Sequence, residues 1–302
     1  MTRLANQLTI WASLLLAVLG AGCHGNESPP TGEKSTESHV KEHKPAKKRT
    51  PKPLTVATYN VHYANSKYDA LSQMLRESRA DVIALQETSP ILERYLKIRL
   101  GRDYPHQFYT GFRDQFLGER FGLLSKVPLR SVRFHPPRHG LFGFLTAEFP
   151  WDGRVVKLIN VHFEPFEASA DWSLFRQLAA IEKIHQEEIL EALKQRDPNQ
   201  PTLIVGDFNS PSDFVAPSEI RKHGFQDSFA HRFKTLAEAD EHNTWRWGLG
   251  EKKLELRIDY IFHDAHWTTR ESRLGEFDDS DHRMLMSTFE LAAGPPLANR
   301  DP

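Results

Sequence analysis

An aspartate and an asparagine two residues apart, Asp207 and Asn209, follow a short apolar run in the second half of the chain. The run, residues 203–205, is Leu-Ile-Val between Pro201 and Gly206, which is typical of a buried strand that ends in a turn. A carboxylate and a carboxamide on such a turn are held ready to contact a ligand. Both residues are also common in ordinary turns, so the pair needs support from elsewhere in the chain.

Other polar side chains stand at the predicted ends of strands or in the loops beside them. Singly, each has a plain structural interpretation: a surface carboxylate, a structural histidine or a solvated acidic loop. The complete set, which contains no cysteine, is Asn60, Glu87, His162, Asp207, Asn209, Asp259, Asp281 and His282. Oxygen ligands suit Mg²⁺, which proteins hold with one or two carboxylates, water and substrate phosphate. Zinc is less favoured, because no two histidines have the spacing that brings both to one ion.

The chemistry that this set supplies is phosphoester hydrolysis. That reaction needs a cation against the phosphate charge, a carboxylate that orients or deprotonates water, and donors for the negative charge that develops. The sequence contains side chains of each kind.

The pattern of strands and helices predicts how the first members of the set come together. Residues 54–61 alternate apolar and polar side chains, residues 68–80 carry a helical apolar stripe, and residues 81–87 form a second apolar strand. Such a strand–helix–strand unit places the ends of its two strands on one rim. We therefore expect Asn60 and Glu87 to be neighbours.

The remaining elements are predicted from the same periodicities. Residues 254–262 are predicted as one strand that contains Asp259, and the acidic segment 278–283 precedes the last strand. Further strands are expected at residues 118–126, 129–134, 141–149, 154–162 and 284–291, and helices at 89–100 and 172–194.

Six short motifs in this order, TYNVH, LQET, NVHFE, VGDFNSPSD, RIDYIF and SDH, resemble those of the endonuclease/exonuclease/phosphatase superfamily. The resemblance covers residues 54–291. It implies a single catalytic domain with a four-layer α/β/β/α sandwich, in which two mixed sheets pack face to face with helices outside. It also implies a Mg²⁺-dependent hydrolase, with Mn²⁺ as a substitute cation, that cleaves phosphodiester bonds by in-line attack of an activated water.

The resemblance also implies which residues form the metal site. Asn60, Glu87 and Asp281 match metal-site positions, and Glu87 matches the direct ligand. Thr244 matches a supporting threonine. Some nucleases of the family carry an aspartate where this chain has His62, which leaves one metal site intact and puts a second in doubt.

Five further residues match the catalytic positions of the family. His162 matches a histidine that contacts the phosphate or assists the leaving group. Asp207 matches the aspartate that orients or activates water, and Asn209 matches its neighbouring contact. Asp259 matches the carboxylate that hydrogen-bonds the catalytic histidine, and His282 matches that histidine, which stabilises the transition state.

The beginning of the chain reads as an export signal. Arg3 is followed by an apolar run over residues 8–22 that is too short to span a bilayer, and then by Cys23, the only cysteine. Residues 19–23 resemble a bacterial lipobox, which implies lipid on Cys23. The alternative is an ordinary signal followed by an incidental thiol. We expect an exported lipoprotein anchored on the extracytoplasmic side of a membrane.

These features divide the chain into four parts. Residues 1–22 are predicted as the signal peptide, 23–53 as a flexible polar spacer, 54–292 as the catalytic domain and 293–302 as a disordered tail.

The charge of the chain bears on its substrate. Residues 24–53 carry seven Lys or Arg and four Asp or Glu, and Arg3 adds one positive charge. Because the whole chain has a net charge of −1, residues 54–302 carry about −5. An acidic catalytic region argues against tight, unselective binding of nucleic acid. Nucleic acid and phospholipid or another small phosphodiester both stay open as substrates of what we expect to be a monomer.

Two other interpretations also stay open. One is a phosphomonoesterase of small phosphorylated molecules, and the other is a non-catalytic surface-binding lipoprotein that reuses the fold. We expect the segments between the motifs, mainly 104–120, 163–172 and 213–242, to decide the substrate.

Overall fold

The computed structural model describes residues 51–111, 118–166, 174–249 and 252–292. The predicted signal peptide, Cys23, most of the predicted spacer and the predicted tail lie outside these ranges. Within them, no helix has both the length and the apolar character needed to cross a membrane.

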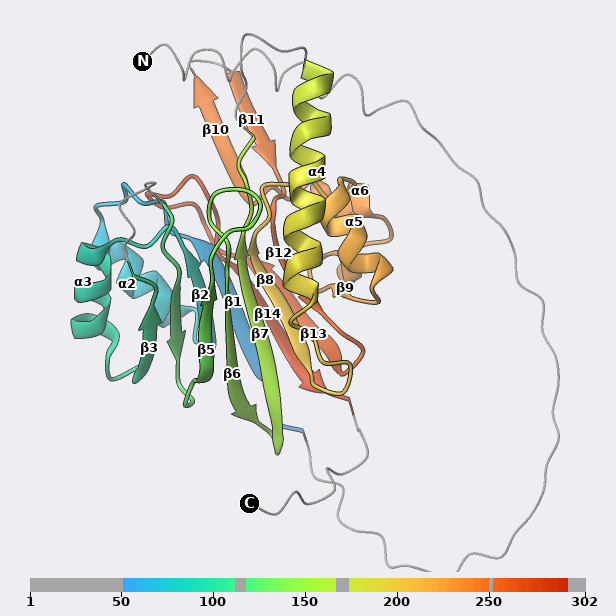
Figure 1. Cartoon of the computed structure of the whole chain (residues 1–302). Helices are drawn as coiled ribbons and strands as arrows, with labels where there is room; N and C mark the ends of the chain where they lie inside the picture. Colours follow the sequence, from blue (N-terminus) through green and yellow to red (C-terminus); the bar gives the residue numbers. More distant parts are fainter. Residues whose placement is uncertain (1–50, 112–117, 167–173, 250–251, 293–302) are drawn as a thin grey trace, which may run out of the picture.

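Two six-stranded sheets form the centre of the molecule (Figure 1). The first has the order β13-β14-β1-β2-β4-β3 and the second the order β5-β6-β7-β8-β12-β9. Both are mixed, because β1 and β2 are parallel in the first and β7 and β8 in the second, while their other pairs are antiparallel. The first sheet contains β1 (Leu54–Asn60), β2 (Val82–Gln86), β3 (His106–Tyr109), β4 (Gly122–Ser125), β13 (Trp267–Leu274) and β14 (Leu285–Leu291). The second contains β5 (Arg130–His135), β6 (Phe144–Trp151), β7 (Arg154–His162), β8 (Thr202–Asp207), β9 (Gln226–Asp227) and β12 (Asp259–His263).

Helices cover the outer faces of both sheets, α2 (residues 68–77) and α3 (residues 90–100) on the first and α4 (residues 174–193) and α5 (residues 215–222) on the second (Figure 1). A sequence signal marks the start of the helix at residues 90–100: the Ser89 side chain accepts a hydrogen bond from Leu92 N and Pro90 opens the helix, a favoured arrangement for a first turn. The helices are α2 (Tyr68–Glu77), α3 (Pro90–Leu100), α4 (Leu174–Leu193), α5 (Val215–Lys222), η2 (Ala230–Arg232) and α6 (Leu236–Asp240).

Alternation along the strands fills three apolar layers. On β8, Leu203 and Val205 face the core between the two sheets, whereas Ile204 faces the core under α4 and α5. A third core lies between the first sheet and helices α2 and α3. Successive side chains of a strand point to opposite faces, so a strand buried on both sides reads as a continuous apolar run. The predicted four-layer sandwich is confirmed.

The strand registers bring the ends of several strands to one edge. Asn60 pairs with the last residue of β2, so Glu87 follows directly beside it, and His162 of β7 pairs with Asp207 of β8. Asp259 begins β12 opposite Asp207, because that pair is antiparallel. Close approach of β7 and β8 requires Gly206, where a Cβ would lie 2.0 Å from Val161 O at a φ of +140°.

One strand prediction is wrong. Residues 254–262 form two strands rather than one: β11 (Lys252–Leu256) pairs with β10 (Trp245–Leu249) in a separate hairpin, and β12 joins the second sheet. The break occurs at Arg257, whose buried guanidinium pairs with Asp227 and Asp240. The hairpin projects from the end of the sheets (Figure 1), the end at which the strand-end residues Glu87, His162 and Asp207 lie.

Candidate active site

Three residues directly after or close to strand ends have an unusual backbone. His62, Glu87 and Asn209 have φ values of 58°, 58° and 46°, in the left-handed region. Residues other than glycine rarely adopt this conformation, which costs free energy and concentrates at functional sites. All three line one cleft, so the strain points to a site at this edge of the sheets.

Asp207 lies at the centre of this site and is fully buried. Asn60 Nδ2 donates to Asp207 Oδ2 and to Glu87 Oε1, both at 2.9 Å, and Asn209 N donates to Asp207 Oδ1 at 2.9 Å. Burial raises the pKa of the Asp207 carboxyl, although the charge of His282 partly opposes this. The carboxylate is therefore fixed in orientation and has an increased proton affinity, as a general base requires.

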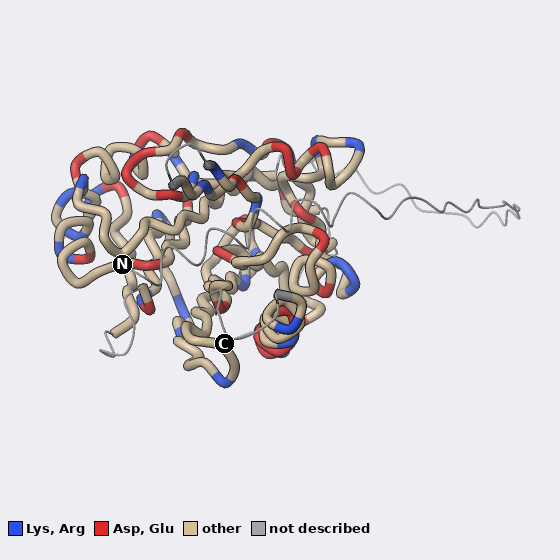
Figure 2. Tube along the Cα trace, turned by 90° about the horizontal axis from the view of Figure 1, so that it is seen from above, with Lys and Arg blue, Asp and Glu red and all other residues tan. Residues whose placement is uncertain are grey.

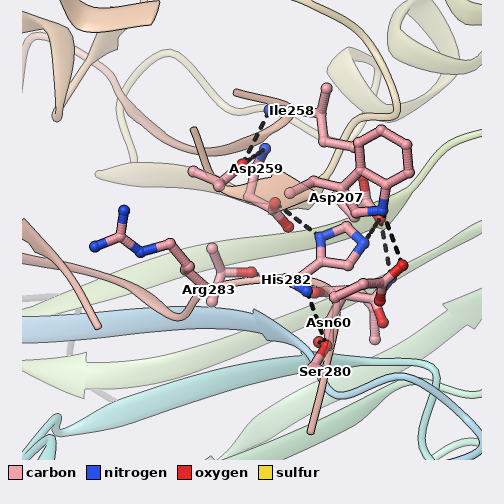
Figure 3. A network of polar contacts seen from close by, with 12 residues as sticks. Asn60, Asp207, Ile258, Asp259, Ser280, His282 and Arg283 are labelled. Carbon is pink, nitrogen blue, oxygen red and sulfur yellow. Dashed lines mark hydrogen bonds and ion pairs between the residues drawn. The ribbon is translucent and has the colours of Figure 1, made fainter. Parts of the chain in front are cut away.

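His282 lies between two carboxylates (Figure 3). Its Nδ1 is 2.9 Å from Asp259 Oδ2 and its Nε2 is 3.5 Å from Asp207 Oδ2. Burial disfavours the charged ring, but the charges of Asp259 and Asp207 outweigh this and raise the pKa of His282. Ser280 Oγ accepts from His282 N at 3.1 Å and donates to Asn60 O at 2.8 Å, which ties this loop to β1. The ring is a cationic donor at neutral pH.

His162 also lies beside Asp207. Its Nε2 lies 3.7 Å from Asp207 Oδ2 and 3.8 Å from Glu87 Oε1, and its ring stacks on Phe142 with centroids 4.1 Å apart. Burial, and then the charge of His282, lower the pKa of His162 to about 3, against a smaller effect of the Gly118 backbone. The two histidines therefore differ in charge, one cationic and one neutral.

The carboxylate oxygens of Glu87 and Asp281 fit a hard cation on their side of the site. Glu87 Oε2 accepts from Tyr63 N at 3.1 Å, and Asp281 Oδ2 accepts from Trp245 Nε1 at 2.9 Å. Asp281 Oδ1 is buried and has no hydrogen-bond partner among the described residues. Such an oxygen is rare unless an ion or water satisfies it, and oxygen ligands of this kind suit Mg²⁺.

A second set of side chains also has suitable spacing for a cation. Ligand atoms of Asp207, Asp259 and His282 all lie within 4.8 Å of one another. The hydrogen bond to Asp259 and the raised pKa of His282 argue for a proton in this set, because a protonated imidazole cannot be a ligand.

The site opens into a cleft of about 360 Å³. No lysine or arginine is present among the described residues that line it. Its walls are His62, Tyr63, Glu87, Phe142, His162, Pro165, Phe166, Asp207, Asn209, Trp245, Trp247, Leu256, Ile258, Asp281 and His282. The cleft thus joins a polar floor to an aromatic and aliphatic wall.

Six of the eight residues predicted from strand ends line this cleft. The other two contact residues that line it: Asp259 hydrogen-bonds His282, and Asn60 hydrogen-bonds Glu87 and Asp207. Thr244 Oγ1 accepts from the N atoms of Ile258 and Asp259, both at 3.0 Å, and so holds the start of β12.

The sequence interpretation missed the apolar wall. Trp245 and Trp247 of β10 line the cleft, and their only signal was the spacing of two tryptophans on alternate residues. In the segments expected to decide the substrate, Phe166 lines the cleft, whereas Phe163 packs in the outer core. Phe112, Phe116 and Trp172 lie outside the described residues.

Comparisons with known proteins agree with this fold. A model described as the Endonuclease/Exonuclease/phosphatase family matches residues 57–282. The structure of D. rerio TDP2 complexed with single strand DNA product has a TM-score of 0.62 and 20% identity, over 79% of this chain and 99% of that chain. TDP2 from C. elegans has a TM-score of 0.57 and 18% identity, over 79% and 75% of the two chains.

An endonuclease/exonuclease/phosphatase from Beutenbergia cavernae DSM 12333 has a TM-score of 0.59 and 15% identity, over 82% of this chain and 73% of that chain. At these identities the solved structures show a shared fold. No curated protein matches this sequence.

Proposed function

This chain belongs to the endonuclease/exonuclease/phosphatase family and is a metal-dependent hydrolase of phosphoester bonds, and from this premise we propose that it is a magnesium-dependent phosphodiesterase. The observation that carries the proposal is the position of His282. The ring is held by Asp259, is close to Asp207, and faces a cleft that Glu87 and Asp281 also line.

Asp207 is the group that prepares the attacking water. Both of its oxygens are fixed by hydrogen bonds from Asn60 and Asn209, so a water that donates to it approaches from the cleft in one direction. The raised pKa of the carboxyl lets it accept the proton that the water loses on attack. Water and phosphate are thereby aligned for in-line displacement.

His282 stabilises the charge that develops on the phosphate. Its Nδ1–H is used by Asp259, which leaves the Nε2–H of the cationic ring for a phosphate oxygen in the cleft. His162 is neutral and can contact the substrate without bringing a second positive charge. A bound Mg²⁺ at Glu87 and Asp281, with Asn60 beside them, would supply positive charge against the phosphate oxygens.

The lining of the cleft favours a compact phosphodiester that carries an apolar or aromatic group. Nucleic-acid binding relies on Lys and Arg beside the phosphates, and none of the described lining residues is of that type. The wall formed by Trp245, Trp247 and Leu256 suits an apolar group beside the scissile phosphate. A small diester or a phospholipid therefore fits better than a long nucleic acid, which is the alternative substrate.

The test compares three substrates with purified full-length protein, with and without Mg²⁺. The substrates are bis-p-nitrophenyl phosphate, a choline phospholipid and plasmid DNA. We expect Mg²⁺-dependent turnover of one or both of the first two, and a loss of about 10²–10³-fold in kcat for His282→Ala. His223→Ala is the matched control, because His223 is exposed at the end of α5.

Each outcome decides one part of the proposal. Plasmid nicking that is lost in His282→Ala, without turnover of the small diester or the lipid, would keep the chemistry and replace the substrate class. Turnover that His282→Ala leaves unchanged would contradict the role of the ring. No turnover of any of the three would refute the phosphodiesterase.

A further inference from the structure

A second cavity, of about 370 Å³, lies behind the segment that carries His282. Three arginines line it, Arg232, Arg273 and Arg283, together with Phe229, Phe233, His242 and Leu274. None of these residues lines the catalytic cleft. Figure 3 shows the Arg283 side chain directed away from Asp207, on the other side of the segment. We call this the arginine cavity.

The arginines of this cavity differ from Arg257 and Arg270 in what they contact. Arg257 pairs with two carboxylates, and Arg270, on the same strand β13 as Arg273, pairs with Glu290. Arg232, Arg273 and Arg283 have no carboxylate partner among the described residues. Three arginines without a carboxylate partner among the described residues thus line one cavity; Arg232 and Arg273 are exposed and Arg283 is half-buried, so their positive potential is accessible to a dissolved anion.

Backbone carbonyls hold the three guanidinium groups in place. Arg232 Nη1 donates to Ser272 O, and Arg273 Nη2 donates to Ser78 O at 3.5 Å. Arg283 donates from Nε to Gly275 O at 2.7 Å and from Nη1 to Asn243 O at 3.4 Å. A guanidinium has five N–H donors, so each keeps at least three for a ligand.

Aromatic rings also fix Arg232. Its guanidinium carbon lies 5.7 Å and 5.6 Å from the ring centres of Phe229 and Phe233, within the range of a cation–π contact. The His242 ring packs against Phe233 with centroids 5.0 Å apart. The rings thus hold the Arg232 guanidinium in place. They leave its positive charge, which a carboxylate would neutralise. This arrangement is preorganised for an anion.

We propose that the arginine cavity is a second ligand site, which binds the phosphate group of a small organic phosphate. Guanidinium groups bind phosphate oxygens with paired, charge-assisted hydrogen bonds, and three of them line this one cavity. A small ligand suits the size of the cavity. A long polyanion would meet acidic residues as well, because Figure 2 shows Asp and Glu interspersed with Lys and Arg along the chain.

The arginine cavity shares its backbone with the catalytic site. Arg283 follows His282, and its N donates to Thr244 O at 2.7 Å, while Thr244 holds the start of β12. A phosphate bound at Arg283 would therefore contact the segment that positions the catalytic ring. The binding itself needs no metal and no catalytic residue, so it can be measured separately from the proposed reaction.

The test is calorimetric titration of the full-length protein with pyrophosphate and with inorganic phosphate, in EDTA and at low salt. Arg232→Gln and Arg273→Gln each remove one charge from the cavity and leave the catalytic cleft intact. We expect each to weaken binding by at least tenfold, on the scale of a charged hydrogen bond. Arg270→Gln removes an arginine of the same strand outside the cavity and should bind like the wild type. Thermal melting without ligand checks that all variants fold.

A single-stranded oligonucleotide in the same titration distinguishes the sources of the phosphate. Tighter binding of the oligonucleotide than of pyrophosphate, with the same losses in both variants, would keep the phosphate site and assign it to a nucleic-acid strand. The absence of phosphate and pyrophosphate binding, or binding that folded Arg232→Gln and Arg273→Gln retain in full, would overturn the proposal.

Discussion

At the scale of single residues, the site contains two buried carboxylate oxygens that lack a hydrogen-bond partner among the described residues, Asp259 Oδ1 and Asp281 Oδ1. An unsatisfied buried acceptor costs about 1–3 kcal/mol. A fold that keeps two of them beside one cleft loses stability that substrate, cation or water can return on binding. Their positions differ, because Asp259 already holds His282 whereas Asp281 is held by Trp245.

This difference predicts which carboxylates bind the cation. Glu87→Gln removes an oxygen charge and keeps the size of the side chain, so the Mg²⁺ concentration for half-maximal activity should rise at least tenfold, on the scale of altered metal sites. Asp281→Asn should act in the same direction. The measurement is activity against Mg²⁺ concentration, and Glu255→Gln, exposed on the hairpin, is the control. An unchanged requirement in Glu87→Gln, with a raised one in Asp259→Asn, would move the cation to Asp207, Asp259 and His282.

A second residue-scale prediction concerns Glu188 of α4, outside the site. Its Oε2 accepts from Glu164 N at 3.1 Å, and its Oε1 has no hydrogen-bond partner among the described residues. Burial raises the pKa of the Glu188 carboxyl well above 4.5, the Glu164 N–H opposes this, and the Glu164 charge adds to it. Other ionisable groups nearby are His185, which bonds Glu164 O, and Arg138, His139 and Glu191 around the adjoining small cavity.

The sign of the pH effect follows from this raised pKa. Below pH 4.5 the carboxyl is protonated in both the folded and unfolded states, and as the pH rises the unfolded chain releases its proton first. The free energy of unfolding therefore falls as the pH rises from 4.5 to the pKa of Glu188 in the folded state. Glu188→Gln keeps the acceptor without the charge, so the Tm of the wild type should fall relative to the variant by roughly 3–5 °C per pH unit in this window. A Tm difference that stays constant with pH would contradict the raised pKa.

At the scale of elements, segments with a clear apolar pattern or cap could be predicted from sequence, and elements that depend on tertiary contacts or have a polar face could not. Strand β7 and helix α3 show clear alternation or a clear cap, and both were placed within a residue of their observed bounds. The break at Arg257 was missed because its cause is tertiary: the buried pairs with Asp227 and Asp240 interrupt an apolar run that reads as one strand. Strand β13 was missed because one of its faces is polar and exposed.

The same distinction applies to the site. Strand-end polar residues could be predicted because a parallel pair brings its ends to one edge, as β7 and β8 do with His162 and Asp207. The hairpin belongs to neither large sheet, and its place over the cleft follows from contacts with the segment of Asp281 and His282, namely the bridge between Trp245 and His282 and the hydrogen bonds of Trp245 Nε1 and Arg246 N to Asp281. No local pattern carries that information.

The hairpin has an apolar face that we expect to bind substrate. Trp245 and Trp247 point to the same side as their cross-strand partners Leu256 and Leu254, whereas Arg246 and Glu255 form the other side. Trp247→Ala should raise KM for bis-p-nitrophenyl phosphate by roughly tenfold and leave kcat nearly unchanged, because the ring touches substrate away from the reacting atoms. KM for methyl p-nitrophenyl phosphate, which has a smaller second group, should change less.

The control for the hairpin is Glu255→Ala, on the opposite face of the same element. It should leave both KM values unchanged. A loss in kcat with equal effects on the two substrates would show that Trp247 supports the catalytic residues, through Trp245 and Asp281, and would remove it from substrate selection.

At the scale of the whole molecule, the catalytic region carries about −5 and the segment before it about +3, since residues 24–53 contain seven Lys or Arg and four Asp or Glu. We propose that the first part of the chain directs export and that lipid on Cys23 keeps the enzyme on the extracytoplasmic face of a membrane. Each buried CH₂ of an acyl chain contributes about 0.8 kcal/mol to bilayer binding. A whole acyl chain therefore contributes more than a few basic residues do. The catalytic domain would then act close to the membrane surface.

Removal of the thiol separates the anchor from the catalyst. Cys23→Ser should move the protein from the membrane fraction to the soluble extracytoplasmic fraction, measured by fractionation and immunoblotting. Its kcat for bis-p-nitrophenyl phosphate should stay unchanged, because the described site contains no residue before Asn60. Lys47→Gln tests the basic run of the spacer and should stay with the membrane. If Cys23→Ser remained membrane-bound and Lys47→Gln were released, the charge of the spacer, rather than lipid, would attach the protein to the membrane. Any effect of the membrane surface on turnover would then depend on the salt concentration.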